Sequence, residues 1–535
     1  MSESPLLGAI LSHAGSAPDA LFATYHDVGR GDWEPVTRGA MRDRITQFAQ
    51  LTRDAGGGAG DVVLLIMEHG PDAHAAFLGA MLAGGAPAFL PYPSAKQDHS
   101  LYWKQHRSIF ESSGARIIVS YDALAPELAA FVADLDIRVV PTSAATTLPV
   151  GDRFALPPAE SVALLQHSSG TTGLKKGVCL SHDAISTQLK SYAATIALPS
   201  LPVFATWLPL YHDMGLVSSF LLPAWLGAPI VSIDPFVWIA TPRLFLDAIA
   251  RFGATHAWLP NFAFAVLVRA ARGGASWDLS SLLALISCSE PCKASTMALF
   301  ARTFAPHGLD PHALQTCYAM AETVFAVSQS VPGQPLRTIE VDGVPLLSNG
   351  PALPGMQVRI TRDGTELPPG TVGEIEVRAP FLFSGYHNNP AATAAAFVGD
   401  WYRTGDLGLL DAGEVFVAGR TKDLIIINGK NVMAHDVEAA VTLVDGVKPG
   451  RCVAFGRYSE RNGSEELVVV AELDMAGASG SDVRLAINDA VLAEAGVACA
   501  DIRLVHSGWL VKTTSGKTSR ADNARKYAAE FLPAP

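Results

Sequence analysis

A loop rich in glycine and hydroxyl side chains lies between residues 166 and 178, where the sequence reads QHSSGTTGLKKGV. The glycines leave the backbone free to wrap around an anion, and the hydroxyls and Lys176 supply hydrogen-bond donors and positive charge. This composition is typical of a phosphate-binding loop, although a polar surface loop would share it. Its spacing matches neither the GxxxxGK[ST] of P-loop proteins nor the GxGxxG of dinucleotide-binding folds. The candidate phosphate-binding residues are Ser168, Ser169, Gly170, Thr171, Thr172, Gly173 and Lys176.

Two acidic side chains stand in patterns that suit a nucleotide. Tyr318 precedes Glu322 by four residues, and a ring and a carboxylate at this spacing can stack on a base and hold a divalent cation against phosphate oxygens. Asp406 ends the stretch YRTGD, and on a turn its carboxylate can bind both hydroxyls of a ribose. Each pattern also has an ordinary structural explanation, a helical Tyr/Glu pair in the first case and a capped turn in the second.

A basic stretch near the C-terminus, residues 512–520, reads KTTSGKTSR. Lys517 in this Gly/Ser/Thr loop can meet negative charge that develops in a transition state. The alternative is a solvated basic tail.

The overall composition describes a large folded protein. The chain has 535 residues, 49% of them hydrophobic and 17% charged, which is enough for several cores. Its net charge of −12 argues against a general nucleic-acid binder. The six scattered cysteines fit reduced thiols in a cytoplasmic protein. The N-terminus lacks the pattern of a signal peptide, and we interpret the uncharged window 214–233 as a buried strand–turn–helix and not an integral membrane segment.

Strands and helices that alternate along the first 290 residues predict parallel sheets with helices on both faces. A strand at 162–165 is expected to lead into the Gly-rich loop and a helix at 182–192 to follow it. Because ligands of open α/β sheets bind at the carboxyl ends of strands, this position suits a functional loop. Other strands are expected at 62–67, 86–90, 117–120, 206–210, 256–259 and 283–287.

The pattern changes near residue 350. Alternating strands at 357–361, 373–377 and 414–419 predict a small β subdomain over about 350–420. A further break at GRTKD, residues 419–423, separates it from a compact α+β region. The sequence therefore predicts an α/β fold with an N-terminal domain, residues 1–420, built from two α/β sheet subdomains and the β subdomain. A small mobile α+β domain, residues 423–535, is expected to follow a hinge at 421–422.

These patterns, in this order and at these separations, resemble the adenylate-forming superfamily of acyl-CoA synthetases, luciferases and adenylation domains. The resemblance runs from about residue 21 to 526 and includes FLGAMLAGGAPAFLPYP, GEIEVRAPFLFSGYHNNPAATAAAF and GRTKDLIIINGKN. Within the superfamily, WLPLYHDMGL, LPNFAFAVLV, ISCSEP, SNGPALPG and KPGRCVAFG are most similar to fatty acyl-AMP ligases. Amino-acid-activating domains usually carry a different stretch where YHDMG stands.

The resemblance implies a role for each matching residue. The loop would hold the β- and γ-phosphates of ATP, with Thr171 and Lys176 nearest. Mg²⁺ would be bound by Glu322, and Thr171 is a second candidate. The catalytic residues would be Lys517, His212 beside the substrate carboxylate, and Glu322, with Lys422 at the hinge. The remaining implied nucleotide contacts are Ser289, Glu290, Pro291, Tyr318, Ala319, Asp406 and Arg420, and the implied walls of the acyl pocket are Phe220, Trp225, Asn261, Phe262 and Phe264.

The implied reaction has two steps. The acid attacks the α-phosphorus of ATP to give an acyl-adenylate, because a free carboxylate is a poor electrophile, and a thiol then attacks the acyl carbonyl. Bringing two anions together requires magnesium, Lys176 and Lys517. Rotation about the hinge would then withdraw Lys517 and admit the thiol.

The chain departs from the family pattern at two places, of which the first concerns the stiffness of the phosphate loop and the second concerns the acceptor. Lys175-Lys176-Gly177 stands where most relatives have Pro-Lys-Gly, and the connection 328–348 is short where fatty acyl-AMP ligases commonly carry an insertion that disfavours coenzyme A. The first hypothesis is transfer of a fatty acyl group to the phosphopantetheine thiol of an acyl carrier protein or carrier domain. An acyl-CoA ligase is the enzyme alternative. A non-catalytic nucleotide-binding homologue is the third, and the joint presence of Lys517, Glu322 and Asp406 argues against it.

Overall fold

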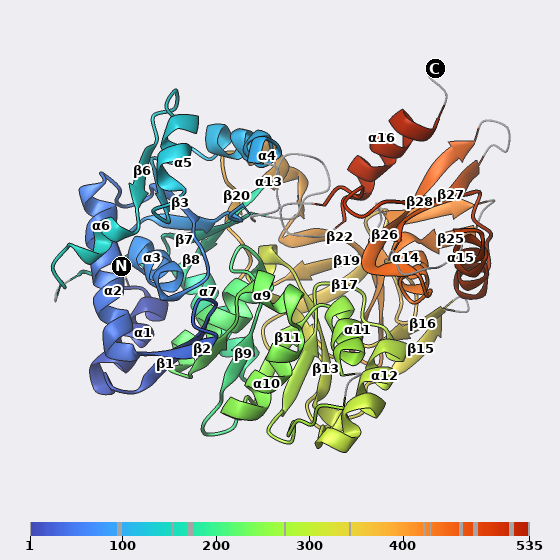
Figure 1. Ribbon diagram of the computed structural model, residues 1–535, viewed down its shortest axis with the longest axis horizontal. Helices are drawn as coiled ribbons and strands as arrows, with labels where there is room; N and C mark the ends of the chain where they lie inside the picture. Colours follow the sequence, from blue (N-terminus) through green and yellow to red (C-terminus); the bar gives the residue numbers. More distant parts are fainter. Residues whose placement is uncertain are drawn as a thin grey trace.

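The structure is a computed structural model that describes residues 2–93, 99–151, 154–167, 176–271, 274–341, 344–420, 423–427, 430–459, 464–473, 480–512 and 518–532. Most of the described chain forms a body of sheets and helices, and the C-terminal elements lie at one side of it (Figure 1). Within these ranges, no helix combines the length and apolar character that crossing a membrane would need.

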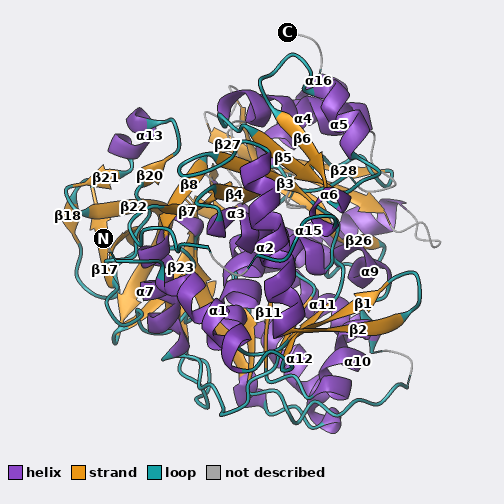
Figure 2. Ribbon diagram, turned by 90° about the vertical axis from the view of Figure 1, so that its left-hand side faces the viewer, coloured by secondary structure: helices purple, strands orange, loops and turns teal. Residues whose placement is uncertain are grey.

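The first sheet is four-stranded and parallel, in the order β4-β3-β5-β6. Its strands are near-continuous apolar runs, as strands covered on both faces require. At Gly79 a Cβ atom would lie only 2.8 Å from the backbone of α2, so glycine permits the close packing of α2 and α3 that Figure 2 shows from the side. The elements are β3 (Val62–Ile66), β4 (Ala86–Phe89), β5 (Ile117–Ser120), β6 (Arg138–Pro141), α1 (Pro5–Ser16), α2 (Arg38–Asp54), α3 (Pro71–Leu82), α4 (His99–Ser112), α5 (Ala125–Phe131) and α6 (Ser143–Thr146).

The second sheet has eight strands in the order β14-β13-β12-β11-β9-β10-β1-β2. Its six central strands run parallel, and an antiparallel strand closes each edge. The strands are β1 (Leu21–Asp27), β2 (Asp32–Thr37), β9 (Phe204–Thr206), β10 (Ile230–Ser232), β11 (His256–Leu259), β12 (Ala284–Ser287), β13 (Leu314–Ala319) and β14 (Ala326–Gln329). The helices are α7 (His182–Ala193), the π-helix η1 (Met214–Leu221), α8 (Leu222–Leu226), α9 (Pro235–Ala240), α10 (Arg243–Phe252), α11 (Asn261–Ala270) and α12 (Ala294–Phe304).

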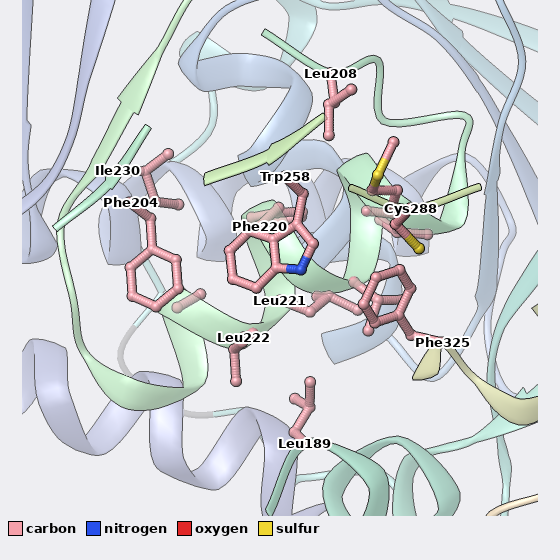
Figure 3. Packing of buried hydrophobic residues seen from close by; sticks show 14 of the residues in the cluster. Leu189, Phe204, Leu208, Phe220, Leu221, Leu222, Ile230, Trp258, Cys288 and Phe325 are labelled. Carbon is pink, nitrogen blue, oxygen red and sulfur yellow. The ribbon is translucent and has the colours of Figure 1, made fainter. Parts of the chain in front are cut away.

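The core beneath this sheet combines the apolar packing seen in Figure 3 with a buried chain of hydrogen bonds. The ring of Trp258 stacks parallel to that of Phe204 at 5.8 Å, and both are about 1% exposed. Trp258 Nε1 donates to Tyr192 Oη at 2.8 Å, and Tyr192 Oη donates to Gln329 Oε1 at 3.0 Å. The chain satisfies polar atoms that would be costly to bury alone and ties α7 to the edge of the sheet.

The loop predicted to bind phosphate lies between two antiparallel strands, which corrects the strand–helix arrangement expected from the sequence. β7 (Val162–His167) pairs with β8 (Gly177–Ser181), and β8 pairs with β20 (Gly385–Tyr386). The expected helix does follow, as α7. The strand β8 was missed because five residues that begin with glycine show no strand pattern of their own, and its partner β20 lies about 200 residues away.

The apolar window 214–233 is buried, as predicted, but its order is helix–turn–strand and not strand–turn–helix. It folds as η1, α8 and β10, with Gly227 in the left-handed conformation at the end of α8. A Cβ at Gly227 would also lie 2.8 Å from the ring of His13, so a larger residue would clash as well as strain the backbone.

The β subdomain forms a six-stranded sheet, β18-β17-β19-β22-β21, with β23 paired to β22. Asp406 stands within strand β22, which corrects the expectation of a turn. Gly405, with φ of 72°, interrupts the ladder just before it, and the register shifts nearby on both sides of β22. The elements are β17 (Gln357–Arg362), β18 (Thr365–Glu366), β19 (Gly373–Arg378), β21 (Phe397–Val398), β22 (Trp401–Asp411), β23 (Glu414–Arg420) and α13 (Pro390–Ala395).

The short connection 328–348 contains a hairpin of β15 (Thr338–Val341) and β16 (Val344–Leu347). The C-terminal region follows with β24 (Leu424–Ile427), β25 (Lys430–Met433), α14 (Ala434–Thr442), β26 (Val447–Ser459), β27 (Ser464–Leu473), α15 (Gly480–Ala495), β28 (Asp501–Val505) and α16 (Arg520–Phe531).

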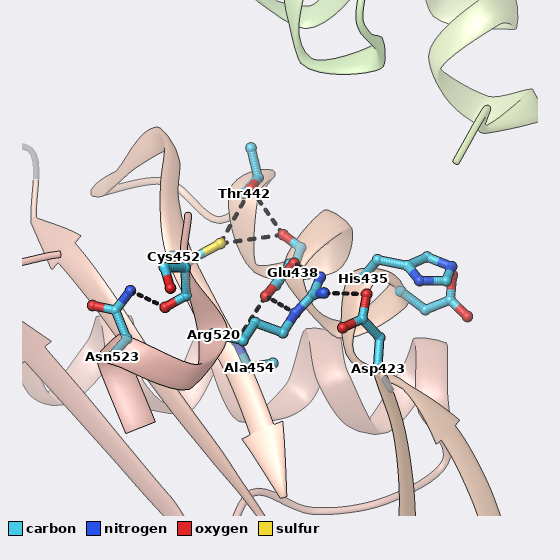
Figure 4. Close-up of polar contacts among 10 residues, drawn as sticks. Asp423, His435, Glu438, Thr442, Cys452, Ala454, Arg520 and Asn523 are labelled. Atoms are coloured by element: carbon cyan, nitrogen blue, oxygen red, sulfur yellow. Dashed lines mark hydrogen bonds and ion pairs between the residues drawn. The ribbon is translucent and has the colours of Figure 1, made fainter. Parts of the chain in front are cut away.

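The C-terminal region has hydrophobic clusters of its own. One cluster joins the sheet β26-β27-β28 to α14 and α15, and a second covers the sheet with Trp509 and α16. Arg520 binds Glu438 and Asp423 through distances of 2.5–2.9 Å between nitrogen and oxygen, which ties α16 to α14 (Figure 4). Among the described residues, these clusters draw on residues 425–532 alone, which is what a separately packed domain requires.

Candidate active site

The site residues follow consecutive strands of the second sheet. Strands β10, β9, β11, β12 and β13 are parallel, so their carboxyl ends meet at one edge. Tyr318 is the second-last residue of β13, Ser289 follows β12, Asn261 follows β11, and His212 follows β9. One edge of the sheet therefore carries several of the residues that the sequence suggested for the nucleotide and the acid, as open α/β sheets do at a ligand site.

Tyr318, Asp406 and Arg420 form a connected group. Tyr318 Oη donates to Asp406 Oδ2 at 2.6 Å, and Arg420 Nε donates to Asp406 Oδ1 at 3.0 Å. Burial raises the pKa of Asp406, and the positive charge of Arg420 opposes that shift. The Asp406 side chain is 8% exposed and that of Arg420 is 55% exposed. The Asp406 carboxylate thus holds the Tyr318 ring on β13 beside the β subdomain, and the Arg420 guanidinium lies on the solvent side of the carboxylate.

Glu322 lies in the turn η4 (Ala321–Thr323), directly after β13. Its carboxylate is half-buried and accepts a hydrogen bond from Tyr386 Oη at 3.0 Å. Burial raises the pKa of Glu322, and hydrogen bonds from the phenols of Tyr386 and Tyr402 partly offset this. Sequence reasoning missed Tyr386, although it lies in the quoted stretch SGYHNNP, because nothing in that stretch points to Glu322.

Lys176 is the candidate phosphate ligand that the structure describes. Its Nζ lies 4.5 Å from the centre of the Tyr386 ring. The other loop candidates, Ser168, Ser169, Gly170, Thr171, Thr172 and Gly173, lie outside the described residues.

The segment Ser289–Pro291 joins the nucleotide side of the site to α11. Ser289 has φ of 66°, a conformation that non-glycine residues rarely adopt and that recurs at functional sites. Glu290 Oε2 accepts from the backbone N–H of Phe262 at 3.1 Å, at the first turn of α11. A carboxylate there is favoured because the first N–H groups of a helix lack partners within the helix. Ala319 is the last residue of β13, next to Tyr318.

The proposed wall residues of the acyl pocket differ in their surroundings. Phe220 and Phe264 are fully buried in the main cluster, and Phe264 packs edge-on against Phe300. Trp225 is half-buried, and its backbone oxygen accepts from His13 Nε2 at 3.1 Å. Phe262 is 38% exposed. His212 lies in the turn that leads into η1, and its ring contacts that of Tyr211.

A pair of tryptophans beside this edge was missed as a candidate. The rings of Trp207 and Trp238 stack face to face at 3.6 Å, and Phe262 lies edge-on to both. Trp207 begins the quoted stretch WLPLYHDMGL, so that motif held a signal, whereas Trp238 in α9 stands in no pattern that we recognised. The three rings follow the carboxyl ends of β9, β10 and β11.

The C-terminal region contacts the N-terminal body beside the nucleotide segment. Lys293 forms an ion pair with Asp436 of α14, and Arg269 of α11 donates to the backbone oxygen of Thr442 at 3.2 Å. Lys512 pairs with Thr518, which brackets the segment 513–517. Lys517 and the hinge residue Lys422 lie outside the described residues.

Lys512 lies in a mixed charge environment. Burial lowers its pKa to about 8, repulsion by Arg451 adds to the shift, and the carboxylates of Glu472 and Glu290 oppose it. The effect of Glu290 indicates that Lys512 lies near the segment Ser289–Pro291.

Comparison with known proteins gives consistent matches. A family model described as AMP-binding enzyme matches residues 12–387. The long-chain-fatty-acid–AMP ligase FadD28 of Mycobacterium tuberculosis is 30% identical over 584 residues, covering 98% of each chain. FadD25 of the same organism, whose name describes a fatty-acid–CoA ligase, is 29% identical over 590 residues with the same coverage. A solved structure from a study of fatty acyl-adenylate ligases of E. coli and L. pneumophila is 25% identical, with a TM-score of 0.88 over 99% of this chain and 98% of that one.

Proposed function

Because this chain belongs to the AMP-binding enzyme family, we propose that it is a fatty acyl-AMP ligase. It activates a fatty acid with ATP, releases pyrophosphate, and passes the acyl group to the phosphopantetheine thiol of a carrier protein. The observation that carries this proposal is the convergence of Tyr318 and Glu322, at the end of β13, with Asp406 and Lys176 from distant parts of the sequence.

The contacts of Tyr318 and Asp406 support an adenosine site. The Asp406 carboxylate has one hydrogen bond to each oxygen from Tyr318 and Arg420, and each carboxylate oxygen has a further lone pair for a ribose hydroxyl. The Tyr318 ring is held in place by the same hydrogen bond, so its face is fixed for stacking. Ser289, Glu290, Pro291 and Ala319 border this group.

Glu322 suits a magnesium ion that substrate phosphates also bind. Magnesium prefers carboxylate and phosphate oxygens and is usually held by one or two protein carboxylates, and Glu322 offers one half-buried carboxylate next to Lys176 and Tyr386. Within the described residues, no cluster of three or more potential ligands forms a metal cage. When bound, magnesium would neutralise phosphate charge, and Thr171 is a second candidate ligand.

Charge and position account for the first step. Lys176 draws the phosphates to the Glu322 side of the site, and Lys517 approaches from the C-terminal region to offset the charge of the acid and the α-phosphate. His212 orients the carboxylate beside β9. The acid oxygen then attacks the α-phosphorus and pyrophosphate leaves. Domain rotation about Lys422 withdraws Lys517 and lets a thiol attack the acyl carbonyl, which releases AMP.

The aromatic group of Trp207, Trp238 and Phe262 supports an apolar acid substrate, because its rings follow β9, β10 and β11 at the same edge of the sheet as His212. Phe220, Trp225, Asn261 and Phe264 are further wall candidates. We also place the enzyme in the cytoplasm, because all six cysteines are free thiols and a reducing compartment keeps them so.

A cationic cluster supports an acidic carrier protein as acceptor. Lys448 and Arg451 lie in a bulge of β26, where the register shifts between Val447 and Cys452, and both add positive charge around Lys512. Lys448 Nζ donates to Ser507 Oγ at 2.9 Å near the surface. Complementary charge at the rim of an interface chiefly increases the rate of association.

The test supplies the protein with ATP, magnesium, a panel of fatty acids, and either coenzyme A or a phosphopantetheinylated carrier protein. Mass spectrometry is expected to find acyl-AMP and acylated carrier, with little acyl-CoA. Efficient acyl-CoA formation would instead favour the CoA ligase, and the absence of adenylate with every acid would favour a non-catalytic homologue. Lys448→Glu is expected to raise the KM for the carrier protein and to leave the KM values for ATP and the fatty acid unchanged. The matched control is Lys190→Glu on the exposed surface of α7.

A further inference from the structure

Strand β20 joins the two parts of the proposed phosphate site through its backbone. His387 N–H donates to the oxygen of Gly177 at 2.7 Å and Ser384 N–H donates to that of Cys179 at 3.0 Å, which fixes the residues just after the phosphate loop. Phe383 N–H donates to the backbone oxygen of Glu322 at 2.9 Å. One short segment thus holds the end of the loop and the turn that carries the carboxylate.

The side chain of Tyr386, in this segment, also contacts both Glu322 and Lys176. Its Oη donates to Glu322 Oε1 at 3.0 Å, and its ring lies 4.5 Å below the ammonium group of Lys176. Tyr386 is 8% exposed. Its ring packs against Phe383 at 4.9 Å, so the phenol has little freedom to turn away.

Tyr402 completes the arrangement. Its oxygen lies 3.4 Å from that of Tyr386. A phenol has a single proton; that of Tyr386 is donated to Glu322, and both Glu322 and the Tyr386 oxygen can accept the proton of Tyr402. The geometry thus orients the Tyr386 proton toward the carboxylate and leaves the face of its ring for Lys176.

We propose that Tyr386 is a positioning residue that holds Glu322 and Lys176 in register for one magnesium-bound triphosphate. This inference rests on the proposed function, since it takes Glu322 as the magnesium carboxylate and Lys176 as the phosphate lysine. The hydrogen bond sets the direction of the carboxylate, and the ring supports the ammonium group through a cation–π contact. The two effects come from different atoms of one side chain, so substitutions can separate them.

The experiment measures ATP binding to the full-length protein by calorimetry, once with magnesium and once with EDTA. Tyr386→Phe removes the hydroxyl and keeps the ring. It is expected to weaken binding of Mg·ATP about tenfold, as for a lost hydrogen bond to a charged group, and to leave ATP binding in EDTA unchanged. Tyr386→Leu removes ring and hydroxyl, and is expected to weaken binding under both conditions.

Tyr527→Phe is the matched control. Tyr527 is a buried tyrosine whose hydroxyl also donates to a carboxylate, that of Asp501 at 2.7 Å, in the C-terminal region. The Tyr527→Phe variant loses the same type of hydrogen bond away from the site, so its ATP affinities with magnesium and with EDTA should equal those of the parent protein. Melting temperatures of all variants show whether each one folds.

The outcomes separate this inference from its premise. If folded Tyr386→Phe binds Mg·ATP like the parent, or loses affinity equally with and without magnesium, the positioning role is wrong. Glu322→Gln is the reference for the premise and should abolish the gain in affinity that magnesium gives. If Glu322→Gln leaves that gain intact, the proposed magnesium carboxylate is wrong, whatever the Tyr386 variants show.

Discussion

A buried ion pair crosses the contact between the N-terminal body and the C-terminal region. Lys293 Nζ pairs with Asp436 of α14 and lies 4.0 Å from Glu494 of α15. The paired side chains are 15% and 12% exposed. Lys293 stands two residues after Pro291, so the pair connects the proposed adenine segment to the domain that carries Lys517. We predict that Lys293→Met loosens this arrangement and slows adenylate formation.

The magnitude follows from burial. Removing one partner of a buried ion pair costs about 3–5 kcal/mol when the remaining charge stays buried. Asp436 can be hydrated again if the N-terminal body and the C-terminal region separate. The lost free energy therefore destabilises the closed arrangement of these two parts and not the folding of either one. A loss of about 3 kcal/mol reduces the closed population relative to the open one by about 100-fold. Adenylation should therefore slow by between about tenfold and 100-fold, depending on how far the parent favours closure.

The assay is single-turnover formation of acyl-AMP by rapid quench, compared with transfer from preformed acyl-AMP to the carrier. Lys293→Met should slow the first reaction and leave the second unchanged or faster. The double variant Lys293→Met/Asp436→Asn leaves no uncompensated buried charge, because the Glu494 side chain is 40% exposed, and should recover much of the lost rate. The reasoning is refuted if the single variant forms adenylate at the parent rate, or if both reactions slow equally.

Three further predictions follow. Asp406→Ala should weaken ATP binding at least tenfold in calorimetry, because charge-assisted hydrogen bonds to the ribose are lost; unchanged affinity would remove Asp406 from the ribose site. Lys517→Ala should abolish adenylate formation while ATP binding stays within about tenfold, or about 1.4 kcal/mol; an equally large loss of binding would rule out a transition-state role. Burial lowers the pKa of His182 to about 4. As pH falls below about 6.5, this histidine is therefore protonated in the unfolded chain before it is protonated in the folded one. Stability should therefore decline from pH 6.5 to 4, by about 3 kcal/mol for this histidine. In chemical denaturation His182→Gln should show a shallower decline, and an unchanged slope would contradict this origin.

Local pattern was sufficient where an element's own residues decide its structure. The apolar runs at β3, β5 and β11 and the helix α7 lie where the sequence predicted them, to within a residue or two. Burial on both faces requires a continuous apolar run, which is visible in the sequence. Tyr318 and Ser289 were implied as nucleotide contacts by the family resemblance, and the structure brings them to one edge because β12 and β13 are parallel neighbours.

Elements that depend on distant partners could not be predicted. Strand β8 exists because β7 and β20 pair with it on either side. Asp406 reads as a turn residue after Thr-Gly, but pairing of β22 with β19 and β23 draws it into a strand. The π-helix η1 has the same apolar composition as an α-helix or a buried strand, so hydropathy does not distinguish them.

The sequence offered candidates for the residues that would bind the ligands, but not for the residues that hold those candidates in place. Residues with a charge or a ring in a recognisable motif, such as Glu322 and Asp406, could be proposed from the sequence. Tyr386 and Trp238 could not, because their roles arise from contacts with residues that lie 64 and 31 positions away. Such contacts exist only in the folded chain.

The central claim is that the acid oxygen attacks the α-phosphorus of ATP. The most direct test uses a fatty acid labelled with ¹⁸O in its carboxylate, together with ATP, magnesium and carrier protein, and measures the mass of the released nucleotide. We predict AMP that carries one ¹⁸O atom, because the bridging oxygen of the adenylate leaves with AMP when the thiol attacks. Unlabelled AMP, or ADP with labelled phosphate, would contradict the account.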